Sequence, residues 1–299
     1  MNDGIFLCIL CSLLWSISSL FATQAIRSIG AQIYNCLRLT LGSLLLLLVF
    51  LVQGTWVSPS FNHWILLGIS SFVGLSAGDL LLFRGFSILG ARRANLIFMS
   101  NIPLTGVLAF FWFGETLDFT ELLGGGITLT GIAIATTAQT NSQGARTQVD
   151  MVQGGAKKGV MLCLAAALCQ STGLLTLKPI FQSQQYDIIQ IAPIRFIMGG
   201  AVTLTMACAS GKLKEIPKNI GMKPWTNATL ATLLGGVLGF LCYVAGISKV
   251  PASYGALLTS LSSLFLLPIL VVFNQKWPPL QAWIGAILGI LGVYLFVQA

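Results

Sequence analysis

Four charged side chains lie within or at the ends of long apolar runs: Arg38, Asp79, Arg84 and Arg195. A charge inside a bilayer costs about 2.5–3.5 kcal/mol on insertion scales, so such residues usually mark solute sites, proton sites or ion pairs. Asp79 is the carboxylate placed inside an apolar run. Two roles are open for it. It is either a site for a substrate amine or a proton, or the partner of Arg38 or Arg84 in an ion pair that fixes one end of a helix bundle.

Arg38 and Arg195 open corresponding apolar runs, and we expect them near opposite faces of the membrane. They either anchor carboxylates or cap neighbouring helix ends. Larger uncharged side chains supply a second set of candidates. Trp15 and Ser16 share one helical face with Ser12 and Ser19. We predict a central cavity lined by Trp15, Ser16, Asn101, Gln170, Tyr243 and Ser260. For the serines, hydrogen bonding to their own helix backbone is the alternative.

The composition requires that these residues be held in a membrane. The chain has 299 residues, of which 56% are hydrophobic and 8% charged, with a mean hydropathy of +0.87. A soluble domain carries roughly 25% charged residues. The net charge of +8 comes from basic residues in short loops, which set membrane orientation, and no basic patch interleaves with aromatics as nucleic-acid binding requires. The expected partners are therefore a small-molecule solute and the lipid bilayer, with no nucleic acid.

Enzymatic chemistry is not expected. Membrane enzymes gather His, Asp, Glu or Cys at the water boundary, whereas this chain has one histidine and scattered acids. The Cys8-x2-Cys11 pair lies inside an apolar run, where small buried side chains pack helices. No cofactor and no metal are predicted.

Ten apolar runs are long enough to cross a bilayer, which takes about 20 residues as helix. They cover approximately residues 4–23, 33–53, 63–83, 94–113, 121–138, 159–180, 188–209, 226–247, 252–274 and 280–298. The longest polar break divides them five and five. We therefore predict an all-α integral membrane protein with a first five-helix repeat (1–139), a linker (140–158) and a second repeat (159–299).

The two halves repeat each other. A shift of 161 positions places Ala91–Ile134 on Ala252–Leu295 without a gap, and it places Gly74 and Gly78 on Gly235 and Gly239. A shift of 155 positions relates the first spans of the halves and places Trp15 on Gln170. Because five is odd, the halves must be inserted upside down relative to each other. Inverted repeats of this kind place two gates around one transport site.

Small residues one turn apart predict close helix crossings in the third, eighth and tenth spans. They are Gly74-x3-Gly78, Gly235-x3-Gly239 and Gly285-x3-Gly289. Pro103 and Pro268 interrupt the fourth and ninth spans and permit bends, which either serve gating or are simply tolerated.

The motif Gly114-Glu115-Thr116, followed by an apolar helix with Gly124 and Gly131, resembles the EamA repeat of the drug/metabolite transporter superfamily. Arg38 with Gly42 fits the same resemblance. In the second half the motif position reads Gln275-Lys276-Trp277 instead.

The resemblance implies a multi-pass exporter or exchanger in the bacterial inner membrane, a plasma membrane. Its solutes would be small metabolites such as amino acids, moved by alternating access, and its cavity would be lined by spans 1, 3, 4, 6, 8 and 9. A flippase for lipid-linked sugar or another lipid is the alternative. Small multidrug members of the superfamily couple efflux to protons through a carboxylate in their first span. That residue is missing here, which leaves facilitated diffusion or coupling through Asp79.

The resemblance and the charges disagree on orientation. Thirteen of the 16 basic residues lie on one side, which puts both termini outside the cytoplasm, whereas family members commonly keep them inside. Either the chain is inserted the other way up, or Arg84, Arg92 and Arg93 line the pathway and bias the count. The substrate, the coupling ion, the direction of transport and the choice between monomer and homodimer stay open.

Overall fold

The computed structural model describes residues 2–53, 56–114, 118–137, 155–183, 185–211, 221–247, 249, 258–259, 261–274 and 278–298. Every regular element in these ranges is a helix, which confirms the predicted all-α class. The first half holds α1 (Asn2–Ile29), α2 (Ala31–Gln53), α3 (Phe61–Ser70), η1 (Ser71–Gly78), α4 (Asp79–Leu89), α5 (Ala91–Phe98), α6 (Asn101–Phe113) and α7 (Phe119–Thr137). The second half holds α8 (Ala156–Leu175), α9 (Lys178–Gln182), α10 (Ile188–Ala209), α11 (Met222–Ala231), η3 (Thr232–Gly239), α12 (Phe240–Ile247), α14 (Ser262–Asn274) and α15 (Leu280–Gln298).

Each of the ten predicted spans corresponds to an apolar helical segment. In the described part of the chain, seven such segments are long and apolar enough to cross a membrane. Three shorter ones, Phe119–Ala135, Ser262–Val272 and Leu280–Leu295, fall on the fifth, ninth and tenth predicted spans.

Two predicted spans end too early. The first continues to Ile29 and the third to Leu89, about six residues beyond their predicted ends. Helical hydrogen bonding carries on past the apolar run until Gly30 and Gly90, whose φ values are 82° and 80°. Only glycine adopts this left-handed region without strain, so these two residues end the helices.

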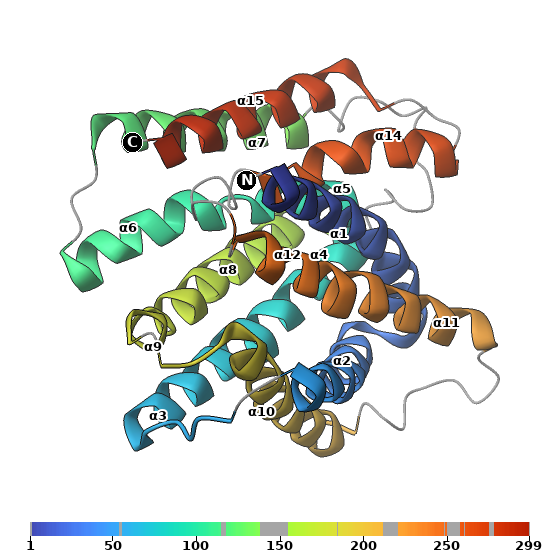
Figure 1. Ribbon diagram of the computed structural model, residues 1–299. Helices are drawn as coiled ribbons and strands as arrows, with labels where there is room; N and C mark the ends of the chain where they lie inside the picture. The colour runs from blue at the N-terminus through green and yellow to red at the C-terminus, as the bar shows by residue number, and fades with distance from the viewer. Residues whose placement is uncertain are drawn as a thin grey trace.

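The two halves pack against each other in a reciprocal pattern (Figure 1). In one direction, α1 of the first half packs on α11, η3 and α12 of the second; in the other, α8 packs on η1 and α4. The pairs α2–α10 and α7–α15 complete the contacts between equivalent helices. The first and sixth spans therefore each cross the third span of the opposite repeat.

Glycines allow these crossings. A Cβ on Gly131 of α7 would lie 2.5 Å from the Gly289 nitrogen, and one on Gly285 would lie 2.5 Å from the Gly131 oxygen. A Cβ on Gly173 would lie 2.9 Å from the Gly74 Cα, and one on Gly239 would lie 2.8 Å from the Trp15 ring. The predicted close approaches in the third, eighth and tenth spans are confirmed.

The third and eighth spans share an irregularity that the sequence did not reveal. Each contains a π-helical segment of eight residues, η1 and η3, and the repeat shift of 161 places one on the other. π-Helical turns are rare and frequently accompany functional sites, because they free carbonyl groups from the regular ladder.

The fourth and ninth spans also have equivalent structure. A turn at Met99 and Ser100 separates α5 from α6, and Asn101 starts α6; 161 positions later, Ser262 starts α14 after a turn at Leu261. The interruption therefore precedes Pro103, which occupies the first turn of α6, where a missing N–H is tolerated. Pro268 lies inside α14.

Candidate functional site

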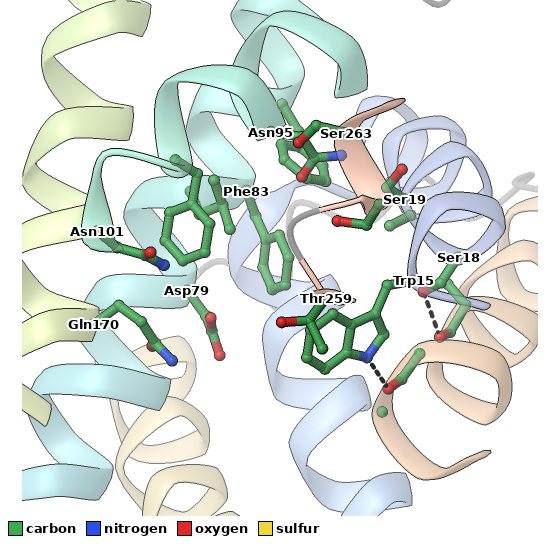
Figure 2. Close-up of a pocket in the computed structure, with 18 of the residues that line it drawn as sticks. Trp15, Ser18, Ser19, Asp79, Phe83, Asn95, Asn101, Gln170, Thr259 and Ser263 are labelled. Atoms are coloured by element: carbon green, nitrogen blue, oxygen red, sulfur yellow. Dashed lines mark hydrogen bonds between the residues drawn. The ribbon is translucent and has the colours of Figure 1, made fainter. Parts of the chain in front are cut away.

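A cavity of about 380 Å³ lies between the two halves. Its wall comes from spans 1, 2, 3, 4, 6, 8 and 9 in the described part of the chain, so span 2 joins the six that the family resemblance implied. The predicted residues Trp15, Asn101, Gln170, Tyr243, Arg38 and Asp79 all line it. Figure 2 shows Asp79, Asn101 and Gln170 together on one side of this space and Trp15 on the other, with Phe83 between them.

Trp15 is held in place by η3. Its indole Nε1–H donates to the Gly235 carbonyl at 3.1 Å, and its ring lies 5.7 Å from the Tyr243 ring, tilted by 37°. Gly74 of η1 is equivalent to Gly235, and its carbonyl accepts from the backbone N–H of Asp79. Phe240 is equivalent to Asp79, but its backbone N–H donates to the Val237 carbonyl. Trp15 therefore adds a side-chain donor at the carbonyl equivalent to that of Gly74.

Gln170 occupies the twin position of Trp15, against η1. Its Oε1 lies 3.8 Å from where a Cβ on Gly74 would be. Beside it, Ser171 Oγ donates to the Asn101 carbonyl at 2.9 Å and fixes the start of α6. The first span has the equivalent contact, from Ser16 Oγ to the Ser262 carbonyl at 2.7 Å.

This contact decides where Ser16 lies. The side chain is buried, its Oγ lies 2.7 Å from both the Ser12 and Ser262 carbonyls, and it is not part of the cavity wall. The prediction that Ser16 lines the cavity is therefore wrong. A hydroxyl this close to two backbone acceptors serves helix packing, which was the alternative stated for the serines. Ser260 falls outside the described residues.

Arg38 and Asp79 form a salt bridge at the cavity wall, with side chains 14% and 13% exposed. The guanidinium lies 5.3 Å from the Phe83 ring centroid and 5.6 Å from that of Phe196. Asn35 supports the pair, because its amide donates to the Leu75 carbonyl of η1 at 3.0 Å. Of the two partners considered for Asp79 in an ion pair, the structure shows Arg38, and the same pair faces the cavity.

Arg195 was expected near the opposite membrane face, away from Arg38. The crossing of α10 with α2 and η1 instead places its guanidinium against Gly74, where a Cβ would be 3.3 Å from Nη2. The Gly74 carbonyl accepts from the Asp79 N–H, so the equivalent arginines of both repeats lie near one carboxylate.

Arg84, Arg92 and Arg93 are not part of the wall of this cavity. Arg84 is exposed on α4, whereas Arg92 and Arg93 are buried in α5. The wall also contains residues that were not predicted, among them Ser18, Tyr34 and Phe83. Tyr34 lies one helical turn before Arg38, and that spacing was an available signal.

A bundle of apolar helices, built from two equivalent halves around a polar cavity, is the architecture of a membrane transporter. The chain belongs to the EamA-like transporter family, whose model matches residues 2–137 and 157–298.

Individual proteins agree with this assignment. An uncharacterized transporter from Methanothermobacter thermautotrophicus is 24% identical over 235 residues, which cover 78% of this chain and 64% of the relative. The chain thus spans less than two thirds of that relative's length. A solved crystal structure of another protein shares the fold, with a TM-score of 0.67 and 18% identity over 99% of this chain and 96% of the other.

Proposed function

We propose that the protein moves small amphipathic metabolites, such as amino acids, across the plasma membrane as an exporter or exchanger that works by alternating access. The observation that carries this proposal is the cavity between the two halves, which combines aromatic rings, amides and one ion pair. Its volume of about 380 Å³ lies at the lower end of the range for small-molecule sites, roughly 300–1,000 Å³.

The lining suits a solute with polar and apolar parts. Asn101 and Gln170 offer donors and acceptors beside the ion pair, while Trp15, Phe83 and Tyr243 offer apolar surface. A solute with several negative charges fits poorly, because the described wall has one arginine.

The packing around the cavity supports alternating access. A hydrophobic cluster joins the C-terminal part of α1, from Ala22 to Ile29, to the end of α4 and the start of α5. It borders the cavity through Phe83 and Phe86, which belong both to this cluster and to the cavity wall. Motion of one repeat against the other would open one side of the cavity and close the other.

The flippase alternative gains no support. It requires a lateral opening wide enough for a lipid, and no observation on the described helices or in the related proteins favours one. The solute transporter is therefore the function that we retain.

Counterflow in proteoliposomes tests the proposal. Vesicles are loaded with unlabelled amino acids and related metabolites, one at a time, and the entry of the labelled solute is followed without an ion gradient. Saturable exchange of at least one solute is expected. If folded, monodisperse protein exchanges none of the panel, the proposed substrate class is wrong.

A further inference from the structure

The charges around Asp79 do not balance. Arg38 binds it directly, and the Arg195 guanidinium lies against Gly74, whose carbonyl accepts from the Asp79 N–H. Two positive charges and one negative charge leave a surplus of one positive charge. The remaining described wall residues are uncharged. Since an unbalanced charge inside a membrane is costly, a bound anionic group would stabilise this arrangement.

The hydrogen-bond donors are also in surplus. Each guanidinium has five N–H donors, whereas a carboxylate accepts about four hydrogen bonds. Among the described residues, the buried Nε atoms of Arg38 and Arg195 have no hydrogen-bond partner. Asn35 Oδ1 accepts from Arg38 Nη2 only at 3.5 Å, the limit of a hydrogen bond. Guanidinium donors around Asp79 therefore outnumber the acceptors that the described residues offer them.

We propose that Arg38 is the receptor for a carboxylate group of the transported solute, and that Asp79 is an internal counter-ion which the solute displaces toward Arg195. The proposal rests on the proposed function and adds the chemical group that the site recognises. Arginine suits this role because its planar fork binds a carboxylate through two parallel hydrogen bonds.

The position of Arg195 gives the exchange a structural consequence. Arg38 belongs to α2 of the first repeat and Arg195 to α10 of the second, and these helices cross in direct contact. In this structure Asp79 pairs within its own repeat. Once a solute carboxylate occupies Arg38, Asp79 pairs across the repeats. Solute binding would then change the ion pairing between the two halves that must move.

The same geometry argues against Asp79 as the receptor for a solute amine. An amine would have to compete with two arginines for one carboxylate. The amide oxygens of Asn101 and Gln170 and the aromatic rings of Trp15 and Tyr243 are alternative partners for an ammonium group, since rings attract cations at their faces. Asp79 is a positioning residue in this scheme.

Two probes with the same phenylethyl group separate the two charges: 3-phenylpropanoate, with a carboxylate and no amine, and phenethylamine, with an amine and no carboxylate. Binding of each to purified protein is measured at equilibrium with labelled probe. We expect 3-phenylpropanoate to bind, and phenethylamine to bind at least about ten-fold more weakly. This ratio of dissociation constants corresponds to the loss of one charge-assisted hydrogen-bonded pair. Equal binding, or preference for the amine, would overturn the proposal.

Variants test the roles of the three residues, with size-exclusion profiles as the folding control. Arg38→Gln should weaken 3-phenylpropanoate binding by about ten-fold or more, and Arg38→Lys should restore part of it. The double variant Asp79→Asn, Arg195→Gln keeps the same net charge as the native site and removes the counter-ion. It should bind 3-phenylpropanoate more tightly, by about ten-fold.

The sign of this last change is decisive. If Arg38 did not hold the carboxylate, freeing it from Asp79 would leave 3-phenylpropanoate binding unchanged or weaker, and the proposal would be rejected. The binding assay needs no transport, so failure of the counterflow experiment and failure of carboxylate recognition are separate results.

Discussion

Of the equivalent positions 15 and 170, each is a control for a substitution at the other. Trp15 and Gln170 are equivalent under the repeat and both line the cavity, but they are held differently. Trp15 donates to Gly235 across the α1–η3 contact, whereas the structure shows no hydrogen bond from the Gln170 side chain to another described residue. We therefore expect Trp15→Phe to lower stability and Gln170→Ala to leave it unchanged.

The magnitude follows from the Gly235 carbonyl. Phenylalanine keeps an aromatic ring beside Tyr243 but removes the indole donor, and the Phe240 N–H already donates to Val237. An acceptor left without its donor costs about 1–3 kcal/mol when buried. Trp15 lines the cavity, so water can reach the carbonyl in part, and we expect the lower half of that range.

Thermal unfolding of the purified protein, followed by size-exclusion fluorescence, measures the difference as a shift in apparent Tm. Gln170→Ala should instead raise KM in counterflow by about three- to ten-fold, the effect of one lost hydrogen bond to solute. The reasoning is refuted if Trp15→Phe unfolds at the wild-type temperature, or if Gln170→Ala destabilises the protein as much as Trp15→Phe does.

Three further variants test the packing and the limits of the site. Gly131→Ala should destabilise the α7–α15 pair by about 1–3 kcal/mol, because its Cβ would clash with backbone atoms of α15 and the two helices would have to move apart. Gly126→Ala is the control, because a Cβ there has no atom within 4 Å, and this variant should unfold at the wild-type temperature or above. Gln190→Ala should lower the apparent Tm, since the buried Gln190 amide bonds both backbone groups of Val57, at 2.5 and 3.2 Å. Arg84→Ala should exchange solute at the wild-type rate. A large loss of exchange would show that Arg84 belongs to the transport site.

The repeat explains why much of the fold could be predicted from the sequence. Glycine spacing gave the crossings in the third, eighth and tenth spans, because side-chain volume alone decides where helix backbones can touch. The π-helical segments η1 and η3 could not be predicted, since their hydrogen-bond slip depends on contacts from other spans, such as Asn35 to Leu75 and Trp15 to Gly235.

The site was predicted in part. Trp15, Asn101, Gln170 and Tyr243 stood out because large polar or amphipathic side chains are rare in apolar runs, and each lies on the wall. Ser16 was misplaced because a serine can satisfy a neighbouring carbonyl as well as a solute. The position of Arg195 beside Asp79 depends on how α10 crosses α2, which a repeat pattern along the sequence does not contain.

The claim that solute passes through the cavity between the halves is tested most directly by substrate protection at Gln170. In a Gln170→Cys variant in proteoliposomes, the rate of modification by a small methanethiosulfonate reagent is measured with and without a solute that exchanges in counterflow, and the wild-type protein reports the background from its native cysteines. Modification that slows in proportion to solute occupancy is the predicted result. A rate unaffected by saturating solute would contradict the assignment of this cavity as the transport site.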